Sequence, residues 1–234
     1  MTRPLLKICG LMRAADVDLC CRLGVDICGF VTEYPLPVPW NLTREQAAAL
    51  LPCVRENAKR CIVTGGPEEK IRELALALRP DYVQLHGGET IQVTAALASA
   101  LAGQGIGVIK TVPAAPAARL REFGTADPAE CAKMLDAAGV FAALVDARGP
   151  ENADRAGLRA DPALFQTVQR AAKCPTILGG GVNSENCAAL IARLRPAALD
   201  VMTGVETAPG EKSEEKLRAL LAAMSAAEAS PPTG

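Results

Sequence analysis

The sequence has few aromatic residues, a single histidine and no excess of charge of either sign. Aromatic side chains make up 3% of the 234 residues, too few for a surface that stacks on nucleic-acid bases. The formal net charge is −1, with 25 Lys and Arg against 26 Asp and Glu, so neither a nucleic acid nor an anionic membrane is indicated as a partner. We therefore expect a small neutral or anionic metabolite as the ligand.

Long apolar runs and paired cysteine motifs are also missing. Charged residues interrupt each apolar stretch before the roughly 20 residues that span a bilayer, and residues 1–6 read as the start of a strand rather than a signal peptide. The nine cysteines include no C-x-x-C pair, and one histidine cannot build a His-rich metal site. This pattern predicts reduced thiols, no metal and a cytoplasmic location.

Short β-branched or apolar runs alternate with amphipathic stretches rich in Ala, Leu and Arg, which predicts eight βα units. Strands are expected at 5–9, 26–31, 60–64, 82–86, 106–112, 141–146, 175–178 and 198–202. Helices are expected at 12–23, 43–52, 67–78, 89–102, 127–138, 161–172, 183–193 and 212–225. We predict an α/β fold, a single (β/α)8 TIM barrel over residues 1–226, with a disordered tail at 227–234. An open, doubly wound sheet is the alternative.

Two proline-containing segments, 33–41 and 111–128, break this rhythm and are expected to be loops at the carboxyl ends of strands, where barrels keep their active sites. Between them, Thr43 and Gln46 form a capping-box pattern that predicts a helix start.

Two titratable residues end predicted strands. Cys9 ends the first strand, where it is either a small buried hydrophobe or a catalytic thiol. Asp146 follows an apolar strand, where a carboxylate is costly unless it faces a polar opening, although it could also cap the next loop. Facing each other across a barrel, such a pair could remove one proton and deliver another, as an isomerase requires.

The glycines at 179–181 precede a helix expected near Asn183, and Thr203 with Gly204 closes the last strand. Backbone N–H groups unobstructed by side chains bind phosphate, and barrels commonly hold a phosphate in the loops after the seventh and eighth strands. We therefore predict a phosphate site that includes Gly180 and Gly181; a tight turn that merely requires glycine is the alternative.

Four further residues could contact the substrate or orient a residue that does. His86 could equally be structural, Asp200 lies within an apolar strand, and Trp40 could either close the site as a lid or plug the barrel rim. The four residues are Gln84, His86, Asp200 and Trp40.

Seven stretches, in order and at matching spacings, make the chain similar to the phosphoribosylanthranilate isomerases of tryptophan biosynthesis. They are LKICGLMRAADV, GVDICGFV, YVQLHGGE, VIKTV, LVDARGPE, TILGGGVNSENC and ALDVMTGVETAPGEKS. The resemblance implies an Amadori rearrangement of an aminoaldose phosphate without cofactor or metal. It implies Cys9 as the general base, Asp146 as the general acid, and Gly180, Gly181, Thr203 and Gly204 as the phosphate cradle.

Two loops depart from the family pattern. The stretch after the second strand has no arginine before Arg44, although the family usually places one there for the anthranilate carboxylate. The loop after Asp146 lacks the usual glycine-rich run and instead brings in Arg148, Arg155 and Arg159, any of which could take over that contact.

Other functions remain open at this stage. The altered loops could mark a paralogue that acts on a different aminoaldose phosphate, or a barrel that binds a sugar phosphate without catalysis. A Schiff-base lyase would need a placed lysine, and Lys110 is the candidate. The expected partner is a phosphorylated aminosugar, and the chain is expected to act as a monomer or a homodimer.

Overall fold

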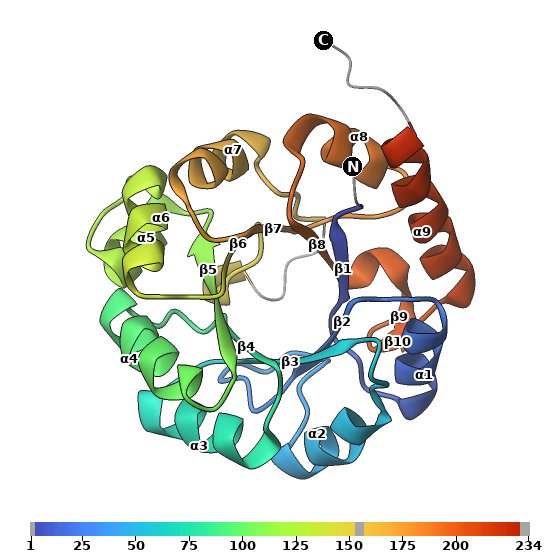
Figure 1. Cartoon of the computed structure of the whole chain (residues 1–234), viewed down its shortest axis with the longest axis horizontal. Coiled ribbons are helices and arrows are strands. Elements are labelled where there is room, and N and C mark those ends of the chain that lie inside the picture. Colours follow the sequence, from blue (N-terminus) through green and yellow to red (C-terminus); the bar gives the residue numbers. More distant parts are fainter. Residues whose placement is uncertain (1–2, 153–156, 230–234) are drawn as a thin grey trace.

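The computed structural model describes residues 3–152 and 157–229. A closed barrel of parallel strands lies at its centre, ordered β1 to β8, with β8 pairing back to β1 (Figure 1). This closed order confirms the predicted TIM barrel and rules out the open sheet. The strands are β1 (Leu5–Ile8), β2 (Ile27–Val31), β3 (Lys59–Thr64), β4 (Tyr82–Leu85), β5 (Gly107–Pro113), β6 (Ala142–Asp146), β7 (Thr176–Gly179) and β8 (Ala198–Val201).

Helices form a ring around the strands (Figure 1). Their inner faces and the outward-pointing strand residues, such as Leu6 and Ile8, form the main hydrophobic core. The helices are α1 (Ala14–Arg22), α2 (Arg44–Leu50), α3 (Glu68–Leu78), α4 (Ile91–Ala102), α5 (Pro116–Phe123), α6 (Pro128–Ala137), α7 (Pro162–Ala171), α8 (Cys187–Leu194) and α9 (Glu214–Ala229).

The segment 111–128 contains helix α5, so the expectation of a loop there was wrong. Pro116 stands in the first turn, where its missing N–H costs nothing, and Gly124 ends the helix with a φ of 76°. The buried Arg119 side chain donates to loop carbonyls that precede the helix. Proline starts this helix rather than interrupting it.

Strand side chains alternate between the helix layer and the barrel interior, as strand geometry requires. Toward the amino ends of the strands, the interior holds a small apolar cluster made of Ile27, Cys61, Ile109, Ala142, Leu144, Ile177 and Ala198. Interior positions nearer the carboxyl ends carry polar groups such as Cys9, Gln84 and Asp146, and these face the cavity described below. The fold therefore gathers its polar strand residues at one end of the barrel.

Other features of the chain are local. Thr43 and Gln46 form the expected capping box, with Gln46 N donating to Thr43 Oγ1 at 3.2 Å and Thr43 N donating to Gln46 Oε1 at 2.8 Å.

All nine cysteines are free. In the described ranges, no helix has the length and apolar character needed to cross a membrane. Of the tail expected at 227–234, residues 227–229 belong to α9, and 230–234 lie outside the described residues.

Candidate active site

A cavity of about 330 Å³ opens at the carboxyl ends of the strands. Twelve of the thirteen residues singled out from the sequence line it. They are Cys9, Trp40, Gln84, His86, Asp146, Arg148, Arg159, Gly180, Gly181, Asp200, Thr203 and Gly204. The thirteenth, Arg155, lies outside the described residues.

A buried ion pair forms the floor of the cavity. Lys7 and Asp200 are directly paired residues on β1 and β8, and Lys7 Nζ lies 2.8 Å from both carboxylate oxygens of Asp200. Burial alone would lower the pKa of Lys7, but Asp200 and the nearby thiols raise it overall, so this ammonium stays charged. Asp200 therefore acts as the ion-pair partner of Lys7 and lines the cavity beside it.

Cys9 lies beside this pair. A methyl group on Gly29 of β2 would stand 3.2 Å from both Cys9 Sγ and Lys7 Nζ, so glycine leaves the room that these two groups occupy. Burial raises the pKa of the Cys9 thiol, Lys7 lowers it, and Asp200 raises it again. The charge balance of the floor therefore controls how much thiolate Cys9 can form.

Asp146 ends β6 on the far side of the barrel from β1 and β2. Burial raises the pKa of its carboxyl group, while the Arg148 backbone N–H, donating to Oδ1 at 2.9 Å, and the Arg148 charge act in the opposite direction. A carboxyl with a raised pKa is suited to donate a proton near neutral pH.

The loops after β7 and β8 meet at one end of the cavity. A methyl group on Gly204 would lie 2.1 Å from the Val182 carbonyl oxygen, and Gly180 and Gly181 adopt φ values of 90° and 70°. Residues 203–205 form a single turn of 3-10 helix. This end of the cavity is built largely from the backbone of these two loops, and Thr203 is also part of its lining.

The helix expected to start near Asn183 begins later, at Cys187. Asn183 Oδ1 accepts from the backbone N–H groups of Glu185 and Asn186, and Asn186 Oδ1 accepts from Asn183 N. These reciprocal bonds form a capping-box pattern like that of Thr43 and Gln46, and Cys187 N donates to the Asn183 carbonyl at 3.0 Å. The helix nevertheless starts four residues later than expected, because a turn at 184–186 separates it from the glycines, whose backbone lines the cavity.

The opposite end is apolar and built from side chains. Trp40 and Tyr34 come from the loop after β2 and pack with Val31 and Val63 against Cys9. Trp40 Nε1 donates to Glu206 Oε1 at 2.9 Å, so the indole is held in the wall. The Arg148 guanidinium lies over the indole, 5.4 Å from the ring centroid.

His86 supports the loop after β6. Its Nε2 lies 3.1 Å from the Arg148 carbonyl oxygen and donates to it, which leaves Nδ1 to accept from Thr111 Oγ1 at 2.8 Å. Burial and the nearby Lys110 charge lower the His86 pKa to about 4. His86 is therefore neutral near pH 7 and acts as a tether, while Gln84 beside it faces the cavity.

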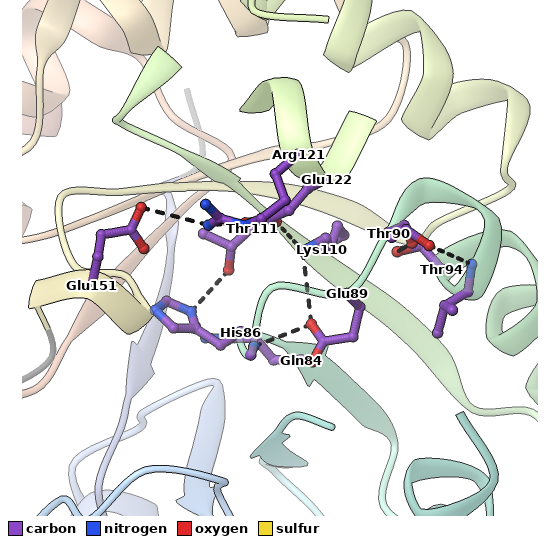
Figure 2. Close-up of polar contacts among 12 residues, drawn as sticks. Gln84, His86, Glu89, Thr90, Thr94, Lys110, Thr111, Arg121, Glu122 and Glu151 are labelled. Atoms are coloured by element: carbon purple, nitrogen blue, oxygen red, sulfur yellow. Dashed lines mark hydrogen bonds and ion pairs between the residues drawn. The ribbon is translucent and has the colours of Figure 1, made fainter. Parts of the chain in front are cut away.

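Lys110 does not reach this cavity. Figure 2 shows it between two buried carboxylates, with Nζ 2.7 Å from Glu122 Oε2 and 3.7 Å from Glu89 Oε2. No lysine lines the cavity among the residues that the structure describes, which removes the geometric basis for a Schiff-base enzyme. Within the same residues, no three His, Cys, Asp or Glu side chains gather to hold a metal ion.

Sequence reasoning missed three residues of the site: Lys7, Tyr34 and Glu206. Lys7 could have been found from the sequence, because a lysine inside the apolar run LLKI is costly to bury unless it is paired. Asp200 is a charged residue of opposite sign inside another apolar strand, LDV, and is therefore a suitable partner. Glu206 left no comparable signal, because its role depends on two loops meeting in space.

Comparison with known proteins agrees with this geometry. The family described as N-(5'phosphoribosyl)anthranilate (PRA) isomerase matches residues 6–223. The N-(5'-phosphoribosyl)anthranilate isomerase of Afipia carboxidovorans is 31% identical, with 97% of this chain and 92% of that protein covered. The chain belongs to this family.

Other members of the isomerase family are similarly close. The enzyme of that name from Haloferax volcanii is 29% identical over 95% of this chain and 93% of its own. The crystal structure of phosphoribosyl anthranilate isomerase from Thermus thermophilus superposes with a TM-score of 0.74 at 30% identity, covering 95% of this chain and 98% of that one. The barrel is therefore shared with these isomerases along nearly its whole length.

Proposed function

We propose that this protein isomerises N-(5′-phosphoribosyl)anthranilate to the corresponding 1-amino-1-deoxyribulose 5-phosphate, with Cys9 as general base and Asp146 as general acid. The observation that carries the proposal is the placement of both groups in one cavity, on β1 and β6, between a backbone-lined end and an aromatic end. A barrel that only bound a sugar phosphate would need the backbone-lined end alone.

The reaction needs one proton from an acid and the removal of another by a base, with no net oxidation. Asp146 gives its proton to the ribose ring oxygen, the bond from that oxygen to C1′ breaks, and the aniline nitrogen, which keeps its hydrogen, forms a protonated imine with C1′. The Cys9 thiolate then removes the C2′ proton, the electron pair of that C–H bond becomes the C1′–C2′ double bond of an enolamine, and the C=N pair returns to nitrogen. Tautomerisation of this enolamine yields the ketose, with the hydrogen count unchanged.

Electrostatics support this division of roles. Burial raises the pKa of Asp146, which favours its protonated form relative to an exposed carboxyl group. Burial also raises the pKa of Cys9, which opposes thiolate formation, and the Lys7 ammonium beside it works against that increase. We infer that Lys7 is the group that makes Cys9 usable as a base.

The phosphate is assigned to the loops after β7 and β8. Gly180 and Gly181 have no side chains and positive φ values, so their backbone N–H groups can approach an anion closely. Thr203 and Gly204 line the same end of the cavity, where Gly204 packs against Val182, the residue after Gly181. Membership of the phosphoribosylanthranilate isomerase family supports a role in tryptophan biosynthesis. A cytoplasmic location and a monomeric or homodimeric state remain predictions alongside this proposal.

The direct test is turnover of freshly prepared phosphoribosylanthranilate, followed by the loss of its fluorescence. We expect the wild type to reach a kcat/KM of about 10⁴ M⁻¹s⁻¹ or more. Cys9→Ala and Asp146→Asn should each lower kcat by about 10²- to 10⁴-fold while retaining affinity for the reduced, unreactive product. Cys174→Ala, a cysteine that does not line the cavity, is the matched control.

Inactive wild-type protein that still binds ribose 5-phosphate would contradict the proposal. It would instead favour a different aminoaldose phosphate as substrate. Full activity in Cys9→Ala would contradict the assigned base.

A further inference from the structure

The segment after β2 offers no cation to the cavity among its described residues. Its first arginine is Arg44, the first residue of α2. Arg44 Nε lies 3.3 Å from Glu33 Oε1, and the side chain is partly exposed and does not line the cavity. Yet the substrate of the proposed function carries a carboxylate on its aromatic ring. The group that binds this carboxylate must come from another loop.

Two described arginines line the cavity, and they lie at different ends. Arg159 is beside the glycine loop, since a methyl group on Gly181 would be 3.3 Å from Arg159 Cγ. The neighbouring Ala160 N–H donates to the Gly180 carbonyl at 3.0 Å, which fixes this segment against the backbone-lined end. Arg159 is therefore placed beside the phosphate rather than the aromatic ring.

Arg148 lies at the other end, over the Trp40 indole. Its backbone is held on both sides, because its N–H donates to Asp146 and its carbonyl accepts from His86 Nε2. The guanidinium therefore extends from a fixed point two residues after the proposed general acid. A guanidinium above an aromatic ring can still donate N–H bonds from its edge to a carboxylate.

The indole beneath it is also fixed. Glu206 Oε1 accepts from Trp40 Nε1 and from the buried Lys212, whose Nζ lies 2.6 Å away. The same oxygen accepts from Gly210 N at 3.1 Å. Gly10 lets the ring lie close to β1, since a methyl group there would be 2.9 Å from Trp40 Cδ1. The loops after β2, β6 and β8 thus meet in one rigid corner.

We propose that Arg148, stacked on Trp40, binds the ring carboxylate of the substrate and selects for it. The inference rests on the proposed function and adds the residue that recognises the aglycone. The aromatic ring packs against the apolar wall at Val31 and Tyr34, and its ortho carboxylate receives two parallel N–H bonds from the guanidinium edge. This contact also orients the aniline nitrogen relative to Asp146.

The test removes the cation and the carboxylate separately and together. Wild type and Arg148→Met are compared on phosphoribosylanthranilate and on phosphoribosylaniline, which lacks the carboxylate. We expect the wild type to prefer the carboxylated substrate by about 10- to 100-fold in kcat/KM, and Arg148→Met to lose most of this preference, mainly through KM. Arg148→Lys, which keeps the charge without the planar stack, should be intermediate.

Two controls separate this role from others. Arg159→Met should weaken both substrates alike, and Arg193→Met, exposed on α8 away from the cavity, should change neither. Thermal unfolding of each variant shows whether the fold is retained. An undiminished preference for the carboxylate in Arg148→Met, or an equal loss on both substrates, would overturn the inference.

Failure of the proposed function can be distinguished from failure of the Arg148 assignment. If the wild type turns over neither substrate, binding of the reduced products with and without the carboxylate still tests Arg148. Trp40 is the only tryptophan, so its fluorescence reports that binding in the wild type and in the Arg148 variants. A carboxylate preference that depends on Arg148 would support the inference even then, and its absence would overturn it.

Discussion

The two ends of the cavity are built differently. The end assigned to phosphate is made of backbone from two consecutive loops, with Gly181 and Gly204 packed so closely that a methyl group would lie within 2.5 Å of a carbonyl oxygen. The end assigned to the aromatic ring is made of side chains from three loops, with Trp40 and Arg148 at its centre. The backbone end tolerates few substitutions. At the side-chain end, a residue from one loop can take over the contact made by a residue from another.

This difference explains how a family pattern can be kept at one end and altered at the other. A backbone cradle depends on residues that permit one conformation, so replacing them removes the site. A cation can reach the same point in space from different strands. An arginine missing from the loop after β2 can therefore be replaced by Arg148 from the loop after β6.

Among the changes that test this comparison of the two ends, the largest effect on binding should come from altering the backbone end. Gly181→Ala forces a methyl group to within 2.5 Å of the Leu158 carbonyl oxygen at a φ of 70°, so the loop must move. We expect affinity for ribose 5-phosphate to fall by about 10- to 100-fold, measured by calorimetric titration.

Gly103→Ala is the matched control for that change, because its added methyl group would meet nothing within 4 Å and its φ is −65°. Affinity within twofold of the wild type for Gly181→Ala would show that this backbone does not hold the phosphate.

A smaller and more specific change concerns the floor between the two ends. Asp200→Asn removes a carboxylate that raises the pKa of Cys9 and leaves the Lys7 charge unneutralised, so the pKa of Cys9 should fall. The rate of Cys9 alkylation can be measured across a pH series by mass spectrometry of the Cys9 peptide. The pH at which this rate reaches half its maximum should be lower in Asp200→Asn than in the wild type.

The same variant should change the activity profile. The active form needs a Cys9 thiolate together with a protonated Asp146. When the pKa of Cys9 exceeds that of Asp146, this form is most abundant between the two values, so the alkaline limb of kcat/KM reports Cys9. That limb should move to lower pH in Asp200→Asn and stay in place in Asp136→Asn, which alters a carboxylate bound to the backbone just before the amino end of β7 and outside the cavity lining. An unchanged limb would contradict the coupling of the floor to Cys9.

The smallest effect is expected at the aromatic wall. Trp40→Phe keeps an aromatic platform for Arg148 but removes the N–H bond to Glu206, worth about 1 kcal/mol. We expect KM for phosphoribosylanthranilate to rise by about threefold to tenfold with kcat nearly unchanged. Tyr82→Phe, at the opposite end of the barrel, should leave both constants at wild-type values. A fall in kcat equal to the rise in KM would show that Trp40 acts on the chemistry rather than on binding.

The sequence predicted the barrel because alternating strand and helix patterns are local. It also predicted Cys9 and Asp146 as facing residues, since strand ends gather at one face of a barrel. It could not predict that α8 starts at Cys187, because the Asn183 and Asn186 pattern is typical of a helix start and the intervening turn is set by the packing of the loop after β7. Nor could it choose among the arginines after Asp146, since the choice depends on Trp40, which is about a hundred residues earlier in the chain.

The most direct measurement compares the two ends in one experiment. The wild type, Gly181→Ala and Arg148→Met are titrated calorimetrically with the reduced product and with two analogues of it, one lacking the phosphate and one lacking the carboxylate. We expect Gly181→Ala to lose the affinity that the phosphate contributes and keep that of the carboxylate, and Arg148→Met to do the reverse. Equal loss of both contributions in either variant, or a phosphate contribution that disappears with Arg148, would contradict the division of the cavity.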